Sequence, residues 1–333
     1  MEAIKRQTFT GKVKSKILGN EDFNFDNLAL EVFRWQAKHV PIYKEYIGKL
    51  GVEIELIDEI TKIPFLPIQF FKNKVVSSQQ HKQPSLIFES SGTTTSTTSK
   101  HYVYDASFAK KVSKKIFEEF YGSLNDYQIL ALLPSYLERN NSSLVFMVDY
   151  FMQYASEGSG FYLDNFEALI EKLQTPNTQK SKKILIGVTF ALLDLAEKGE
   201  NYHDILIMET GGMKGRRKEI VRSNLHDLFK EQLKVDSVHS EYGMTELTSQ
   251  AYSKGNGIFK APHWMKILVR EASDPFCITT EGSGGINVID LANIESCAFI
   301  ETQDLGRIFK NGTFEVMGRF DNSDVRGCNL MVS

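Results

Sequence analysis

The chain has 333 residues, of which 42% are apolar and 24% are charged, and its formal net charge is −3. This composition predicts a soluble globular protein of one large or two medium domains, and it argues against nucleic acid as the main partner because no strongly basic face is implied. Three widely spaced cysteines, Cys277, Cys297 and Cys328, argue against a disulfide framework or zinc site and for a reducing, cytoplasmic location. No signal peptide and no membrane-spanning apolar run is recognised.

The N-terminal part of the chain contains one predicted helix and one extended segment. Residues 1–24 are polar and mixed, and the apolar spacing then predicts a helix from about Asp26 that ends before Pro41. Two prolines in the apolar run 63–71 predict an extended, buried connector rather than a helix.

From residue 105 onward, helices and strands alternate. Asp105 is a predicted N-cap, and the helix that it starts is expected to end at Gly122. The predicted order is helix 105–122, strand 129–133, helix 142–154, helix 164–173, strand 183–188, helix 191–198, strand 205–208, helix 216–229 and strand 235–239. This alternation predicts an α/β fold with a parallel sheet whose faces are covered by helices.

After Ala261 the pattern changes to short strands. They are predicted at 265–269, 285–289, 297–301, 305–309 and 313–317. The sequence therefore predicts a smaller, mostly antiparallel β region at this end of the chain.

A polar loop separates two predicted strands, 86–88 and 101–104. From Glu89 to Lys100 it reads Glu-Ser-Ser-Gly-Thr-Thr-Thr-Ser-Thr-Thr-Ser-Lys. Small residues let backbone N–H groups approach an anion, the hydroxyls add donors, and Lys100 adds a positive charge. These features are typical of a loop that holds a nucleotide polyphosphate, although a flexible surface loop has the same composition. It is not a Walker loop, because the Gly-Lys-Ser/Thr ending and the following helix are absent.

Two further turns follow predicted strands at the edge where open parallel sheets bind ligands. Gly211 and Gly212 permit flat packing against a planar base, or they form an ordinary tight turn. In the run Tyr-Gly-Met-Thr-Glu at 242–246, Thr245 and Glu246 place a hydroxyl beside a carboxylate, which suits a magnesium ion that bridges phosphates. Glu246 could equally be a solvated or capping carboxylate.

Two charged residues near the C-terminus complete the set. Asp304, in Thr-Gln-Asp-Leu-Gly-Arg, lies just before a predicted strand and could accept hydrogen bonds from both hydroxyls of a ribose, or it could be a hairpin-turn aspartate. Arg319, in Gly-Arg-Phe-Asp, could pair with phosphate or ribose oxygens, or it could form a surface salt bridge.

The order of these motifs resembles the adenylate-forming superfamily of acyl-activating ligases, from roughly Pro64 to the C-terminus, and Tyr-Gly-x-Thr-Glu is the most specific of them. Within the superfamily the chain is most similar to the acyl-protein synthetases, the fatty-acid-activating subunits of bacterial bioluminescence, and more distantly to phenylacetate–coenzyme A ligases. The resemblance implies the large N-terminal-type domain of these enzymes over 1–317, with α/β layers at 1–260 and a β-rich subdomain at 261–317. Residues 318–333 would be a hinge-like remnant, with the C-terminal lid domain essentially absent.

The resemblance also implies a role for each motif. Its implied ligands are Ser90, Ser91, Gly92, Thr93, Thr94 and Lys100 for the phosphates, Thr245 for the α-phosphate, Glu246 for Mg²⁺, Gly211 and Gly212 for the adenine with Tyr242 stacked on it and Gly243 beside it, and Asp304 and Arg319 for the ribose. The implied catalytic residues are Thr245, Glu246, Lys100 and Cys328. Cys328 would receive the acyl group as a thiolate favoured by Arg326, or it could be a buried, inert residue.

The implied substrates are ATP with Mg²⁺ and a carboxylic acid of the fatty-acid class. A protein that accepts or donates the acyl group is an implied partner, and an oligomer is compatible with the sequence. The segment 134–139 and the aromatic residues Phe146, Tyr150 and Phe151 could wall an acyl tunnel, or they could be core. Arg139 could pair with the substrate carboxylate or form an exposed ion pair.

The chain departs from the family pattern at three places. Thr95 stands where a glycine is usual, Ser99 stands where a proline is usual, and the lysine of the C-terminal domain has no counterpart. Two alternatives therefore stay open: a degenerate module that binds nucleotide or acyl-adenylate for a partner, and a truncated acyl–coenzyme A ligase.

Overall fold

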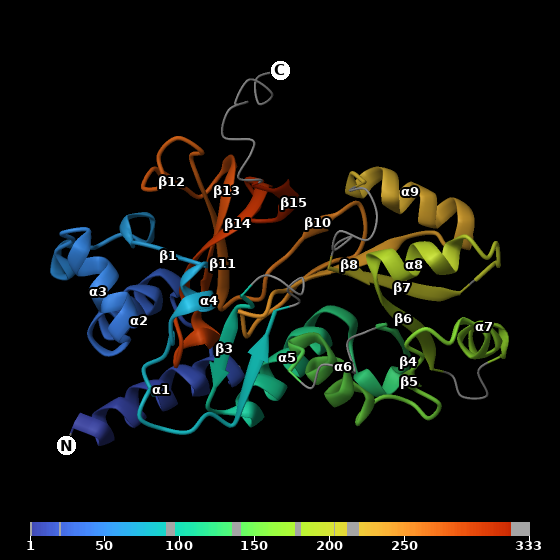
Figure 1. Ribbon diagram of the computed structural model, residues 1–333, viewed down its shortest axis with the longest axis horizontal. Coiled ribbons are helices and arrows are strands. Elements are labelled where there is room, and N and C mark those ends of the chain that lie inside the picture. Colours follow the sequence, from blue (N-terminus) through green and yellow to red (C-terminus); the bar gives the residue numbers. More distant parts are fainter. Residues whose placement is uncertain are drawn as a thin grey trace.

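The computed structural model describes residues 2–19, 21–90, 97–134, 141–176, 181–202, 204–211 and 220–320, of which 2–7 are described by their backbone alone. The α-helices are α1 (Glu2–Leu18), α2 (Phe25–His39), α3 (Pro41–Lys49), α4 (Phe70–Asn73), α5 (Ala106–Tyr121), α6 (Ser143–Met152), α7 (Phe166–Gln174), α8 (Thr189–Ala196) and α9 (Arg222–Leu233). The described strands form two large sheets that lie side by side (Figure 1) and one separate two-stranded sheet.

The strands complete the assignment. They are β1 (Leu66–Pro67), β2 (Leu86–Glu89), β3 (Lys100–Val103), β4 (Tyr127–Leu132), β5 (Gly160–Phe161), β6 (Lys182–Val188), β7 (Ile205–Thr210), β8 (Val238–Tyr242), β9 (Ala251–Ser253), β10 (Ile258–Phe259), β11 (Met265–Arg270), β12 (Ile278–Thr279), β13 (Gly282–Asp290), β14 (Phe299–Ile308) and β15 (Phe314–Arg319). Short 3₁₀ turns lie at Ile54–Leu56, Ile60–Lys62, Leu124–Asp126 and Leu291–Asn293.

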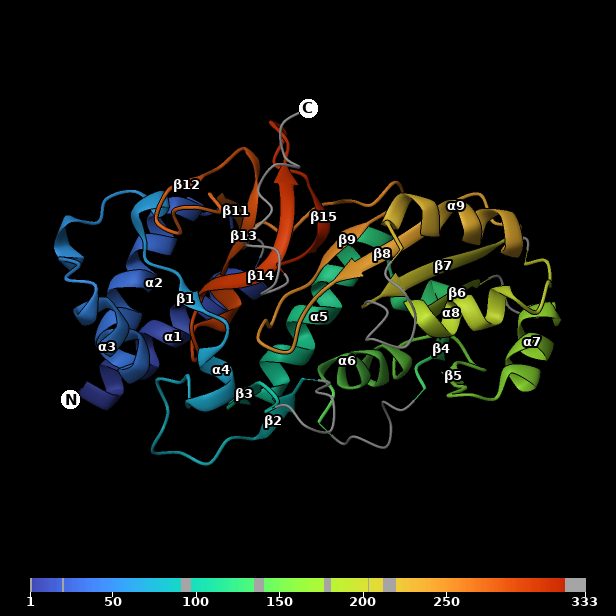
Figure 2. The same ribbon diagram turned by 45° about the horizontal axis from the view of Figure 1, so that its top comes forward.

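The predicted parallel sheet is confirmed. Its order is β5-β4-β6-β7-β8-β9, in which every pair is parallel except β8 with β9. The central strands are buried along nearly their whole length, as expected for a sheet covered on both faces. The crossovers place α8 and α9 together over one face, and α6 packs with α5 at the other (Figure 2).

The second sheet has the order β10-β15-β14-β13-β11-β12 and is antiparallel, with β1 added in parallel to β14. The predicted strands 297–301 and 305–309 are wrong as separate elements, because β14 runs unbroken from Phe299 to Ile308. Asp304 pairs with Arg319 in the ladder and is not in a hairpin turn. A turn-like sequence is overridden here by pairing with the neighbouring strand β15.

The polar loop lies where the sequence predicts it. β2 and β3 form an antiparallel pair that runs from Leu86 opposite Val103 to Glu89 opposite Lys100, so the loop closes a hairpin. Of that loop, residues 91–96 lie outside the described part of the chain.

Several boundaries follow from local chemistry, and three predictions need correction. α1 was not predicted. The 63–71 connector is extended at Ile63 and β1 but not to its end, because the chain turns into α4 at Phe70, where no proline opposes a helix. α9 begins at Arg222 rather than near 216, since Val221 is still extended; residues 216–219 lie outside the described part of the chain.

One apolar cluster extends from Val13 in α1 to Phe314 in β15 and joins the helices to both sheets. Phe299, at the start of β14, lies at its centre, with Phe33, Tyr43 and Phe65 packed around the ring at centroid distances of 6.0 to 6.2 Å. Among the helices that the structure describes, none has the length and apolarity to cross a bilayer.

Candidate active site

The candidate site lies at the carboxyl ends of β7 and β8. β7 leads into Gly211, and β8 ends at Tyr242, directly before the turn that carries Thr245 and Glu246. Because neighbouring parallel strands end at the same edge of a sheet, these two turns lie side by side, as the sequence predicts.

Asp304 is held by two residues that the sequence also singles out. The Tyr242 hydroxyl donates to Asp304 Oδ2 at 2.8 Å, and Arg319 Nε donates to Asp304 Oδ1 at 3.1 Å. Burial, together with the Asp304 charge, raises the pKa of Tyr242 well above its ordinary value, so the phenol stays a donor. The two large sheets thus meet at Asp304. Arg319 does form a salt bridge, and its partner is the predicted site residue Asp304.

The Thr245–Glu246 turn meets the base of the β2–β3 hairpin. His101 Nδ1 lies 3.0 Å from the Thr245 carbonyl oxygen. Burial raises the pKa of Glu246, while the Ser99 hydroxyl and the charge of Arg319 act in the opposite direction. Glu246 is only 5% exposed, so it is not the solvated carboxylate of the alternative interpretation.

The neck of the polar loop is closed by a reciprocal pair of hydrogen bonds. Ser90 N donates to Ser99 O at 3.0 Å, and Ser99 N donates to Ser90 Oγ at 2.9 Å. Lys100 forms an ion pair with Glu89 at 3.5 Å. The other predicted phosphate ligands, Ser91, Gly92, Thr93 and Thr94, lie outside the described residues, as do Gly212, Arg139, Arg326 and Cys328.

Asp290 and Asn293, which the sequence did not indicate, hydrogen-bond to residues 246–249 and so support the Thr245–Glu246 turn. Thr248 N donates to Asp290 Oδ2 at 3.0 Å and lies 2.9 Å from Asn293 Oδ1, and Ser249 Oγ donates to Asp290 at 2.7 Å. Asn293 Nδ2 donates to the Glu246 carbonyl at 2.7 Å. The Asp-x-x-Asn spacing is typical of a cap, which Asp290 also forms, but it does not indicate the long-range contacts.

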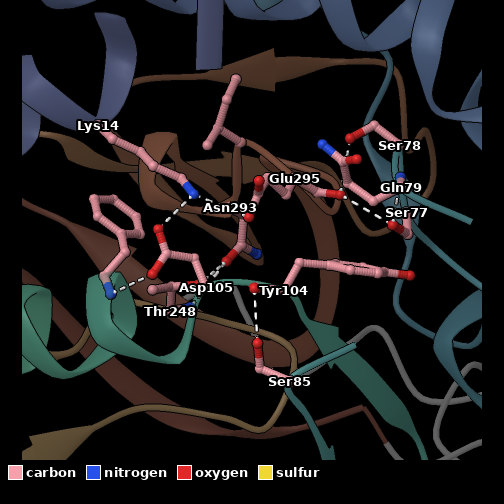
Figure 3. Close-up of polar contacts among 12 residues, drawn as sticks. Lys14, Ser77, Ser78, Gln79, Ser85, Tyr104, Asp105, Thr248, Asn293 and Glu295 are labelled. Carbon is pink, nitrogen blue, oxygen red and sulfur yellow. Dashed lines mark hydrogen bonds and ion pairs between the residues drawn. The ribbon is translucent and has the colours of Figure 1, made fainter. Parts of the chain in front are cut away.

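Two partly buried ion pairs of one lysine join this region to the N-terminal helix. Figure 3 shows the Lys14 side chain between Asp105 and Glu295, close to the Thr248–Asn293 contact. Its Nζ lies 2.9 Å from Asp105 Oδ2 and 3.0 Å from Glu295 Oε2. One lysine thus connects α1, the N-cap of α5 and the segment before β14.

Behind Gly211 lies a buried charged cluster that the sequence did not indicate. Arg222 Nε lies 3.0 Å and His226 Nε2 3.5 Å from Glu209 Oε1. Burial alone would raise the pKa of Glu209, but His226 and Arg222 hold it below its ordinary value. The Thr189 hydroxyl donates to the Gly211 carbonyl at 3.0 Å, and Gly211 has a φ of +72°, which fits a tight turn.

Glu241 is a second buried acid, on the next strand. Burial raises its pKa to about 7, with the Glu209 charge adding to the effect, and the Thr210 hydroxyl donates to its carboxyl group. A Cβ on Gly243 would lie 2.3 Å from Glu241 Oε1, so a larger residue there would have to displace this buried carboxyl group.

The three aromatic residues predicted to wall an acyl tunnel differ in burial and in their packing partners. Phe151 is fully buried and packs on Phe117 at 5.1 Å, which makes it core. Phe146 packs on Phe88 of the hairpin at 5.2 Å, and Tyr150 packs on Tyr154. Phe146 is therefore the tunnel candidate that lies against strand β2 of the hairpin.

The protein side chains around Glu246 could supply only part of the ligand set that a magnesium ion needs. Among the residues that the structure describes, no group of three or more His, Cys, Asp or Glu side chains could hold a metal by itself. Mg²⁺ is commonly bound by one or two carboxylates together with phosphate oxygens and water. Glu246 would thus be a single protein ligand, and nucleotide phosphates would supply others.

The two sheets, the polar hairpin and the Tyr-Gly-x-Thr-Glu turn define the large-domain fold of adenylate-forming enzymes. The model of the LuxE acyl-protein synthetase family matches residues 19–333, and the chain belongs to this family. The predicted family and fold class are thereby confirmed.

Solved structures agree on the fold. ATP-bound MatB from Rhodopseudomonas palustris superposes with a TM-score of 0.53 at 16% identity, over 72% of this chain and 49% of MatB. An ATP-bound RpMatB-BxBclM chimera, B3, gives a TM-score of 0.52 at 16% identity, over 72% and 49%. This chain therefore spans about half the length of the structures that it matches. No curated protein sequence matches it.

Proposed function

We propose that the protein uses ATP to activate a carboxylic acid of the fatty-acid class as an acyl-adenylate and then transfers the acyl group to a protein thiol. The observation that carries the proposal is the convergence of three parts at one sheet edge. These are the Thr245–Glu246 turn, the hairpin base at Ser99 and His101, and Asp304. Membership of the acyl-protein synthetase family supports the same reaction.

The nucleotide would lie across these parts. Asp304, oriented by Tyr242 and Arg319, would accept hydrogen bonds from the ribose hydroxyls. The Gly211–Gly212 turn would lie against the adenine. The polar loop, with its neck closed at Ser90, would surround the phosphates together with Lys100, and Thr245 would bind the α-phosphate.

The bond changes balance in two steps. An oxygen of the substrate carboxylate attacks the α-phosphorus, the new P–O bond forms, and the bond to pyrophosphate breaks. A thiolate then attacks the acyl carbonyl carbon, a C–S bond forms, and AMP leaves with the electrons of the broken C–O bond. Both reactants of the first step are anions, so positioned donors and cations must offset their repulsion.

Glu246 is the proposed magnesium ligand in this scheme. Its buried carboxylate would hold Mg²⁺, which supplies positive charge next to the phosphates when bound. Burial raises the pKa of Glu246, and a bound cation lowers the pKa of a carboxylate beside it. We therefore expect metal binding and ionisation of Glu246 to be coupled.

ATP–pyrophosphate exchange with a panel of carboxylic acids tests the adenylation step. We expect acid-dependent exchange in the wild type and a loss of about 100-fold in Glu246→Gln, because the carboxylate of the turn is removed while its shape is kept. Glu231→Gln, on the exposed face of α9, is the matched control and should exchange at the wild-type rate. Nucleotide binding without exchange for any acid would instead support the degenerate binding module.

Acyl transfer is tested separately with labelled fatty acid and ATP. We expect hydroxylamine-labile label on the wild type and on Cys277→Ser, but none on Cys328→Ser. Label that persists on Cys328→Ser would remove Cys328 as the acceptor. Product formation that requires coenzyme A would favour the truncated ligase.

A further inference from the structure

His101 occupies a fixed position between the hairpin and the Thr245–Glu246 turn. It lies in β3 opposite Phe88, and its side chain is 3% exposed. The Phe71 ring meets the imidazole edge-on at a centroid distance of 6.2 Å, and the Phe88 ring lies at 6.4 Å. Two aromatic neighbours thus hold the ring in place.

The contact with Thr245 defines the tautomer. Nδ1 lies 3.0 Å from the Thr245 carbonyl oxygen, and a carbonyl oxygen can only accept, so Nδ1 carries the proton. Burial lowers the pKa of His101 to about 4, so the ring is neutral near pH 7. A neutral, buried imidazole is suited to hold a backbone group rather than to exchange protons with substrate.

The turn is held at two successive carbonyl groups. His101 donates to Thr245 O, and Asn293 Nδ2 donates to Glu246 O at 2.7 Å. Two fixed carbonyls restrict the peptide planes on either side of Glu246 and hence the directions of the Thr245 and Glu246 side chains. Ser99, two residues before His101, acts on the Glu246 carboxylate.

We propose that His101 is a positioning residue that aligns Thr245 and Glu246 with the phosphates through its hydrogen bond to the Thr245 carbonyl. Ser99, whose side chain hydrogen-bonds the Glu246 carboxylate, would hold the same turn at a second point. The role rests on the proposed function, because it needs nucleotide phosphates beside the turn. It predicts that phosphate binding depends on His101, whereas nucleoside binding at Asp304 does not.

The test compares two probes, Mg·ATP and adenosine, by calorimetry. His101→Phe keeps an aromatic ring between Phe71 and Phe88 but lacks the donor, and we expect Mg·ATP to bind about tenfold more weakly with adenosine unchanged. In His101→Asn the amide nitrogen stands as many bonds from Cβ as Nδ1 does, and we expect it to recover most of the loss. Tyr102→Phe, on the opposite face of β3, is the control and should bind both probes normally.

Two further measurements test the positioning role even if His101→Phe does not fold. If His101→Phe does not fold, the comparison is His101→Asn against His101→Gln, whose amide nitrogen is one bond too far, and Asn must bind Mg·ATP more tightly. In Ser99→Ala we expect the half-saturating Mg²⁺ concentration at fixed ATP to rise, with adenosine affinity unchanged.

Equal losses for both probes, or no loss in His101→Phe, would overturn the positioning role while leaving the proposed function intact. A wild type that binds neither Mg·ATP nor adenosine would overturn the proposed function and the positioning role together.

Discussion

Two buried acids at the ends of neighbouring strands have different protonation behaviour. Glu209 lies between Arg222 and His226, which hold its pKa below the ordinary value, whereas Glu241 receives a hydroxyl from Thr210 and has a pKa raised to about 7. Both carboxyl groups are buried, so their partners decide the difference. Glu241 is therefore an acid that changes charge near neutral pH, directly before Tyr242.

A stability measurement can detect this titration. The ordinary pKa of Glu241 is 4.5 and its pKa in the fold is about 7, so the unfolded chain loses the proton first as the pH rises. The stabilisation present below pH 4.5 is lost as the pH rises through about 7, by up to about 3 kcal/mol. In Glu241→Gln the amide oxygen can still accept from Thr210. Urea unfolding should show that its stability, relative to wild type, is higher at pH 8 than at pH 4.5.

The exposed substitution Glu231→Gln serves as the control, and it should give the same difference from wild type at both pH values. A difference between Glu241→Gln and wild type that did not change with pH would contradict the assigned titration.

At the scale of elements, α5 is the best case of prediction from sequence. Its start and end depend on single residues: Asp105 accepts from Phe108 N at 2.9 Å, and Gly122 ends the helix with a φ of +86°. Such signals are local, so the sequence alone indicates them. β14 is the opposite case, because Asp304 reads as a turn residue although it lies within a strand and pairs with Arg319 of β15.

The contribution of Asp105 to stability as the cap of α5 can be separated from its contribution as the ion-pair partner of Lys14. Asp105 both caps the helix and binds Lys14 at 2.9 Å. We expect Asp105→Ala to lower the free energy of unfolding by about 1 kcal/mol for the cap, with a further loss because Lys14 keeps only Glu295 as an ion-pair partner. Asp105→Asn keeps the cap acceptor but removes the charge, so it should show the second loss alone. Equal stability of wild type and Asp105→Ala would refute the role of the cap.

The candidate site was predictable in its motifs but not in its contacts. Gly211, the Thr245–Glu246 turn and Asp304 are recognised as motifs from the sequence, and the parallel sheet explains why the first two converge. The contacts of His101 with Thr245 and of Asn293 with Glu246 join residues far apart in the chain. Residue patterns carry no information on such pairs, because long-range packing decides them.

Across the whole molecule, Gln36 of α2 joins the N-terminal helices to the segment that supports the site. Its Nε2 lies 3.0 Å from Asn293 O and 3.1 Å from Ile294 O, and its Oε1 accepts from Ala298 N at 2.9 Å. Gln36 is fully buried, so Ala298 N has its hydrogen-bond partner in the protein interior, whereas Asn293 O also accepts from Ser296 N.

Substitution of Gln36 should therefore have a global effect. We expect Gln36→Leu to lower the free energy of unfolding by about 2–3 kcal/mol, because it leaves buried backbone groups without partners. At a pH where the acid is neutral, Gln36→Glu keeps the acceptor for Ala298 N and one O–H donor, so it should lose less stability than Gln36→Leu. Denaturant unfolding measures both, and a loss below about 0.5 kcal/mol in Gln36→Leu would contradict the structural role.

β14 begins beneath the N-terminal helices, at Phe299, and continues to Asp304 without a break. One strand, whose pairing with β13 is irregular between Glu301 and Leu305, thus connects the aromatic cluster around Phe299 with the carboxylate proposed to bind the ribose. Warming that loosens α2 or α3 would displace the same strand, so ribose affinity should decline at temperatures well below global melting. Selection for heat-tolerant activity would then favour substitutions around Phe33 and Tyr43, remote from any substrate.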